Sequence, residues 1–84
     1  MKALVLGLEP SARAQAIAAG LVRTGCATNY RVFGNFVRAD GVGATYWISH
    51  DGTHVLRGDT IGGADELQPG FLEAMARAGH GGVA

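Results

Sequence analysis

The chain is poor in the residues from which small proteins build covalent cross-links. Its 84 residues include a single cysteine, Cys26, and only two prolines. One cysteine excludes an intramolecular disulfide, and a small domain without disulfides is typical of a reducing compartment. We therefore expect a cytoplasmic protein. A chain of this length buries only about 60–65% of the surface that its unfolded form exposes, so we also expect marginal stability unless a partner adds to the burial.

Charge is scarce as well, and it is unevenly distributed. Charged residues make up 17% of the chain, and the net charge is zero. Residues 1–57 contain six basic and three acidic residues, a balance of +3, whereas residues 58–84 contain one basic and four acidic residues, a balance of −3. This pattern permits attraction between parts of the fold or between subunits. It falls short of the basic footprint expected of a nucleic-acid-binding protein.

Long hydrophobic runs are missing. No stretch approaches the roughly 20 apolar residues of a membrane span. The run Leu4–Leu8 follows Lys2, but it is shorter than the apolar part of a secretion signal and leads directly into Glu9-Pro10. We therefore expect no membrane anchor and no secretion signal in this sequence.

Apolar spacing predicts two helices. Within residues 10–24, apolar residues recur every three or four positions, Pro10 suits a first helical turn, and Ser11 can cap it. A second helix is expected over residues 69–78, with Gly79 as its stop. Residues 3–6 form a short run that is apolar on both faces, which predicts a strand that is buried centrally or paired with another chain.

Two strand-like runs, residues 30–33 and 35–38, flank the dipeptide Gly34-Asn35. Both runs are rich in aromatic and β-branched residues. The dipeptide suits either a bulge in one long strand or a tight turn between two short strands. We favour the bulge.

The strongest local signal lies in residues 44–58, which we expect to form a β-hairpin that turns at Asp51-Gly52. With these two residues as the loop, Ile48 faces Val55 and Trp47 faces Leu56. Alternation then places the two pairs on opposite sides of the hairpin. Each side therefore carries a large apolar pair.

Together these elements predict an α+β protein. We expect a single-layer antiparallel sheet of three to four strands with two helices, in the order β-α-β-β-β-α. Residues 1–79 would form one domain, and residues 80–84 a flexible tail.

No set of residues points to catalysis, to a metal or to a cofactor. The spacing of His50 and His54 resembles a zinc pair, but in the expected register the two side chains point to opposite faces. Cys26 follows a helix C-terminus, where a thiolate is disfavoured. Gly7 stands alone where a dinucleotide fingerprint needs three glycines. We therefore expect a protein that is not an enzyme and that carries neither a metal nor a cofactor.

The second face of the hairpin is the best candidate for a functional surface. One sheet layer under two helices covers only one face, which would leave Trp47 and Leu56 exposed on the other. Exposed apolar clusters mark association surfaces, and aromatic residues dominate interface hot spots. We therefore expect a binding protein that acts as a homodimer, unless residues 3–6 or the first helix cover this face within the same chain. The expected interface residues are Trp47, Leu56, Phe33, Phe36 and Tyr46.

The alternative is a nucleic-acid-binding accessory protein. A helix, three strands and a second helix is the element order of double-stranded-RNA-binding domains, which meet phosphates through basic loops and a basic second helix. Here the second helix and the segment before it carry Glu73, Asp65 and Glu66 against one arginine, so phosphate repulsion argues against this function. The residues that would serve it are Arg13, Arg23, Arg31 and Arg38.

Overall fold

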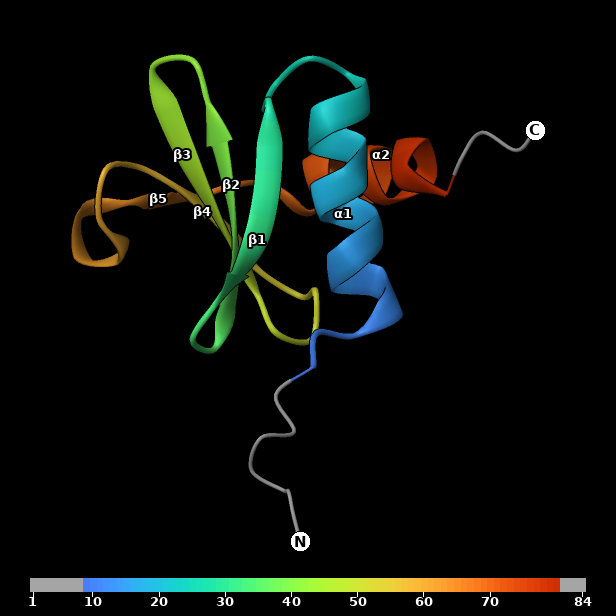
Figure 1. Cartoon of the computed structure of the whole chain (residues 1–84), viewed down its shortest axis with the longest axis horizontal. Helices are drawn as coiled ribbons and strands as arrows, with labels where there is room; N and C mark the ends of the chain where they lie inside the picture. The colour runs from blue at the N-terminus through green and yellow to red at the C-terminus, as the bar shows by residue number, and fades with distance from the viewer. Residues whose placement is uncertain (1–8, 81–84) are drawn as a thin grey trace, which may run out of the picture.

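Residues 9–80 are described by a computed structural model, in which two helices lie on one side of an antiparallel sheet (Figure 1). The elements follow the order α-β-β-β-β-β-α, with one turn of 3-10 helix before the last strand. Their bounds are α1 Ala12–Arg23, β1 Asn29–Phe33, β2 Phe36–Gly41, β3 Ala44–Ser49, β4 Val55–Arg57, η2 Ile61–Gly63, β5 Asp65–Glu66 and α2 Pro69–Gly79.

The α+β class is confirmed, but the predicted order β-α-β-β-β-α is wrong. The sheet is a meander of five strands, each antiparallel to the next, instead of three to four. The strand predicted at residues 3–6 lies outside the described residues. The difference arises because the segment around Gly34-Asn35 forms two strands, and because β5 forms where the sequence indicated only a turn.

Gly34-Asn35 is a two-residue turn, so the favoured bulge is wrong. Phe33 pairs directly with Phe36 across it, and Gly34 has a φ of 63°. A tight hairpin turn of this kind requires positive φ, which glycine adopts without strain. The turn also lets β1 and β2 align five residue pairs, which a single bulged strand could not do.

The hairpin between β3 and β4 turns at Asp51-Gly52 as predicted. Ile48 pairs with Val55 and Trp47 with Leu56, in the expected register. The loop is longer than two residues, because Ser49 N–H donates to His54 O and the amide of Gly52 donates to Ser49 O, which leaves residues 50–53 outside the ladder. The pairing of the strands is unaffected.

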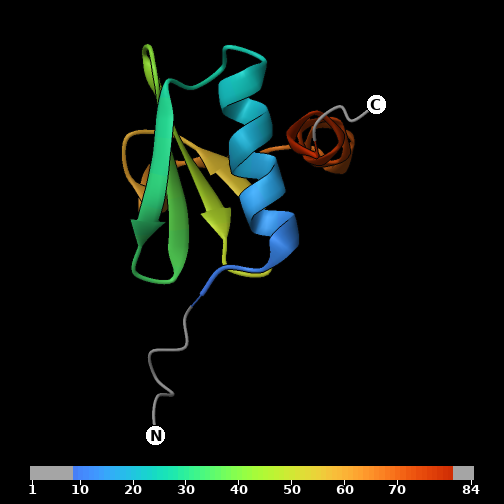
Figure 2. The ribbon, with the colours of Figure 1, turned by 45° about the vertical axis from the view of Figure 1, so that its right-hand side comes forward.

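Both helices lie on the same side of the sheet, with α1 next to the strands and α2 packed against α1 (Figure 2). In Figure 2 α1 stands upright while α2 is seen nearly end-on, so the two helices cross steeply. We call the covered side of the sheet the helix face and the other side the open face. The largest fully buried side chains belong to α1 and to the helix face: Ile17, Leu21, Val37, Ile48 and Val55.

The crossing of α1 and α2 depends on two glycines. A Cβ atom on Gly20 would lie 1.9 Å from the carbonyl oxygen of Met75, and one on Gly79 would lie 1.7 Å from that of Ala16. Both distances are far below van der Waals contact, so the two backbones can approach only because these side chains are absent. Gly79, predicted to stop the second helix, is instead its last residue and a contact residue.

Within residues 9–80, neither helix has the length and apolar character required to cross a membrane.

Candidate association surface

The open face carries a cluster of aromatic residues around Trp47. The indole packs edge-on against Phe33, with ring centroids 5.7 Å apart, and against Phe36, at 6.4 Å. Its Nε1–H donates a hydrogen bond of 3.0 Å to the carbonyl oxygen of Gly58. Edge-to-face packing and a satisfied indole N–H are the arrangement in which a buried tryptophan is most stable.

The guanidinium of Arg38 covers two rings of this cluster. Its Cζ lies 5.2 Å from the centroid of the Trp47 ring and 5.7 Å from that of Phe33, within the range of cation–π contacts. An ion pair of 2.9 Å between Arg38 Nε and Asp40 Oδ1 holds the guanidinium there. As a result only 5% of Trp47 is exposed, although neither α1 nor α2 covers this face.

The structure brings together four of the five predicted interface residues. Trp47, Leu56, Phe33 and Phe36 all belong to the open face, where Trp47 pairs with Leu56 and Phe33 with Phe36. Tyr46 instead points to the helix face. It is buried there, and its ring stacks on that of Phe71.

Sequence reasoning missed the contact of Arg38 with the aromatic cluster. The position of Arg38 opposite Trp47 on the neighbouring strand follows from the turn at residues 42–43, which sets β2 against β3. Arg38 then joins the open face by alternation.

The most exposed apolar side chains of the sheet lie on β1, at its edge. All five residues of β1 are exposed, including Tyr30 (43%), Val32 (54%) and Phe33 (46%). The opposite edge, β5, has only two residues, Asp65 and Glu66. Short, charged edge strands resist pairing with other chains, whereas long apolar ones invite it. The two edges of this sheet therefore differ sharply in their capacity to associate.

A cleft of about 530 Å³ lies beside β1, on the helix face near the start of α1. It exists because α1 leaves the side chains of Tyr30 and Val32 uncovered. Its lining is mainly apolar: Glu9, Pro10, Gln15, Tyr30, Arg31, Val32 and Val37.

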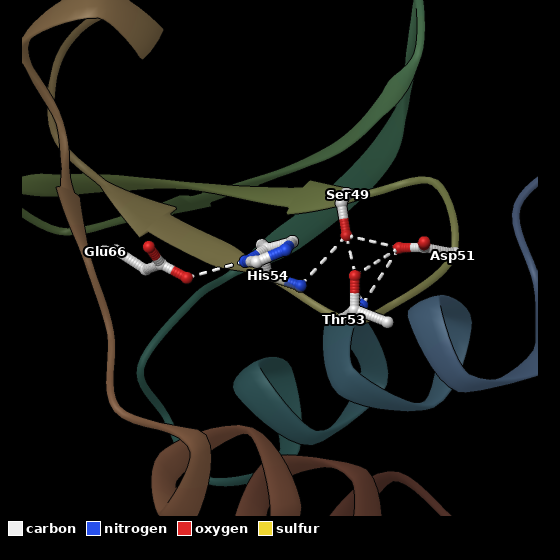
Figure 3. A network of polar contacts seen from close by, with 5 residues as sticks. All are labelled: Ser49, Asp51, Thr53, His54 and Glu66. Carbon is white, nitrogen blue, oxygen red and sulfur yellow. Dashed lines mark hydrogen bonds and ion pairs between the residues drawn. The ribbon is translucent and has the colours of Figure 1, made fainter.

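A polar network surrounds the β3–β4 turn (Figure 3). The hydroxyl of Ser49 donates to Asp51 Oδ1 (2.8 Å) and accepts from the backbone N–H groups of Thr53 and His54. Thr53 Oγ1 also donates to Asp51 Oδ1, at 2.7 Å. These hydrogen bonds, led by the one from Thr53, lower the pKa of Asp51 from 3.8 to about 2. The hydroxyl proton of Ser49 is committed to Asp51, so the network stabilises the turn and offers no nucleophile.

The two histidines of the turn lie in different surroundings. The His54 ring contacts Glu66 on β5, with Nδ1 and Oε2 2.6 Å apart, as Figure 3 shows. The Nε2 atom of His50 is buried and finds no hydrogen-bond partner among the described residues. Within residues 9–80 there is no group of three or more His, Cys, Asp or Glu side chains that could hold a metal ion.

The contact between His54 and Glu66 predicts a measurable titration. The hydrogen bond and the negative charge of Glu66 raise the pKa of His54 above its ordinary value of 6.5. Because the folded-state pKa is the higher one, the ion pair stabilises the fold fully below pH 6.5 and loses its effect as the pH rises through the folded-state pKa. We expect Glu66→Gln to return the His54 pKa towards 6.5 in an NMR titration of the ring protons.

Asp65→Asn is the matched control for this titration. Asp65 is the neighbouring acidic residue but pairs with Arg57 in the ladder. A His54 pKa that moves equally in both variants would refute a specific contact with Glu66.

Comparisons with protein-family models, with curated proteins and with solved structures found no match to this chain.

Proposed function

We propose that this protein acts by binding rather than by catalysis, as a homodimer joined at the β1 edge of its sheet. The observation that carries the proposal is the exposure of the whole of β1, with three large apolar side chains at its surface. A five-residue strand without proline, with one charged residue and with no strand of residues 9–80 paired to its outer edge is the kind of surface to which another strand adds.

The aromatic cluster of the open face packs against the end of β1. Phe33 belongs both to β1 and to the cluster, and its contact with Trp47 holds the end of the strand in place. Trp47 itself is shielded by its own chain, so the proposed contact is centred on Phe33 and the edge rather than on the tryptophan. Burial at this edge would add to the limited apolar burial of an 84-residue chain.

Sedimentation equilibrium tests the proposal. A five-residue edge lies at the small end of protein interfaces, so we expect a dimer that dissociates on dilution over about 5–500 µM. Val32→Lys should raise the dimer dissociation constant at least about tenfold, because it places a like charge on each side of the contact. Val42→Lys is the control, since Val42 is 93% exposed at the β2–β3 turn. A wild-type chain that is monomeric throughout this range would refute the proposal.

The alternative function, binding of nucleic acid, has weaker support. Two of the four arginines that would serve it are paired with carboxylates: Arg13 with Glu73, and Arg38 with Asp40. Arg38 also stacks on Trp47. Such a function requires affinity for duplex RNA or DNA that falls steeply with salt, and the lack of binding at low salt would exclude it.

A further inference from the structure

We infer that β1 pairs with β1 of a second copy of this chain, antiparallel, with Val32 on the twofold axis. This inference rests on the proposed function and deepens it, because it names the partner strand and the register. It follows from three properties of β1: which backbone groups are free, which side chains would meet, and how much room lies beside the strand.

The backbone groups of β1 that no strand of the described residues 9–80 pairs belong to Tyr30 and Val32. Ser49 N–H donates to His54 O and Gly58 N–H to Thr45 O, so the odd-numbered residues of β3 bond to β4. In an antiparallel sheet consecutive residues direct their N–H and C=O groups to opposite sides. The even-numbered residues of β3 therefore bond to β2, and the register of β2 with β3 makes their partners the odd-numbered residues of β2. The even-numbered residues of β2 then bond to the odd-numbered residues of β1. The N–H and C=O groups of Tyr30 and Val32 consequently point away from β2, towards the outer edge of the sheet.

Twofold antiparallel pairing places the helix faces of both copies on the same side of the joined sheet. Two residues that lie directly opposite each other must therefore belong to the same face. Two central registers satisfy this condition: one with Arg31 on the axis and one with Val32 on the axis. The Arg31 register sets two guanidinium groups directly opposite each other, which is destabilising. The Val32 register pairs valine with valine on the helix face and sets Arg31 of each copy opposite Phe33 of the other on the open face.

The Val32 register also uses the outward-facing N–H and C=O groups of Val32. Val32 of the two copies would exchange both backbone hydrogen bonds across the axis. On the open face each Arg31 would lie against an aromatic ring, as Arg38 already does within one chain. The Arg31 register would use the outward-facing groups of Tyr30 and Val32 as well, so hydrogen bonding permits both registers, and the repulsion between the two Arg31 side chains selects the Val32 register.

The cleft beside β1 provides the room. Among residues 9–80 it leaves the helix-face side of Tyr30 and Val32 uncovered, so side chains of the second copy can lie there. Each copy would then cover the apolar side chains that the other leaves exposed.

Pairing at β1 also predicts a closed assembly. The two five-stranded sheets would join into one sheet of ten strands, whose two outer edges are both β5. These edges are short and acidic, with Asp65 and Glu66, and like-charged edges resist further addition. We therefore expect dimers and no fibres.

Disulfide cross-linking of the full chain tests the register. In a Cys26→Ser background, Val32→Cys places the two sulfur-bearing residues opposite each other, with Cα atoms about 5.5 Å apart. With oxidised glutathione, which accepts the two electrons and two protons of the thiol pair, we expect most of the protein to run as a dimer on non-reducing gels. Arg31→Cys should cross-link at least about tenfold more slowly, because its Cα atoms would lie beyond the roughly 7 Å that a disulfide spans.

Val42→Cys in the same background controls for random collision, since that side chain is almost fully exposed far from the proposed axis. Faster cross-linking of Arg31→Cys than of Val32→Cys would overturn the inferred register. A reduced Val32→Cys chain that sediments as a dimer but cross-links no faster than Val42→Cys would overturn pairing at β1. If the reduced chain and the wild type are both monomeric, the proposed function fails together with this inference.

Discussion

Gly20→Ala should destabilise the protein by about 3 kcal/mol or more, although alanine is the better helix former. The new Cβ would lie 1.9 Å from the carbonyl oxygen of Met75, a backbone atom that can move only if the helices separate. Over-packing typically costs about 1–3 kcal/mol, and more where backbone must shift. Gly79→Ala should have an effect of the same sign and size, because its Cβ would lie 1.7 Å from the Ala16 oxygen.

Urea unfolding followed by far-ultraviolet circular dichroism measures this effect. A loss of this size corresponds to a Tm lower by at least about 12 °C for a domain of this length. Gly70→Ala is the matched control: Gly70 also lies in α2, but a Cβ there would meet nothing within 4 Å. Helix propensity should then leave that variant unchanged or more stable by up to about 1 kcal/mol. Equal stability of all three variants would disprove the close helix crossing.

Trp47→Ala is the second change for which we expect a large effect, a loss of about 3–5 kcal/mol of unfolding free energy. The substitution removes the ring on which Phe33, Phe36 and Arg38 pack, together with the hydrogen bond to Gly58. The surrounding side chains are held on two other strands, β1 and β2, so they cannot all close the gap. Trp47→Phe should cost less, because it keeps an aromatic ring and loses mainly the hydrogen bond and part of the stacking surface.

These variants also require circular dichroism, because Trp47 is the only tryptophan and its fluorescence disappears with it. Val42→Ala serves as the control and should stay within about 0.5 kcal/mol of the wild type, as exposed substitutions usually do. A loss below about 1 kcal/mol for Trp47→Ala would mean that the open-face cluster contributes little to the fold. The same variant should also weaken self-association, since Phe33 loses its support.

The strand pairing of the β3–β4 hairpin could be predicted from local sequence, although the loop is longer than predicted. Its turn depends on Asp51-Gly52, and its register depends on the strand residues beside them, so no distant contact is needed. The polar network around Asp51 strengthens a turn that the sequence already specifies. The first helix was predicted for the same reason, since its cap Ser11 and its apolar spacing lie within one segment.

Gly34-Asn35 was misread because the dipeptide alone is compatible with both a bulge and a turn. The choice depends on which pairing buries more apolar surface, and that requires the positions of β2 and β3. The role of Gly79 was misread in a similar way. A glycine at a helix end resembles a stop signal, whereas its contact with Ala16 joins residues 63 positions apart in the chain.

Local sequence specifies the secondary structure of the hairpin and of both helices, and the pairing of Trp47 with Leu56 on one face. Which apolar residues remain exposed depends on the packing of elements that are distant in the chain. Trp47 is shielded because Arg38 of β2 and Phe33 of β1 cover it. In contrast, β1 is exposed because α1 leaves it uncovered and no strand of residues 9–80 pairs with its outer edge. Exposure depends on which elements cover one another, and this cannot be read from neighbours along the chain.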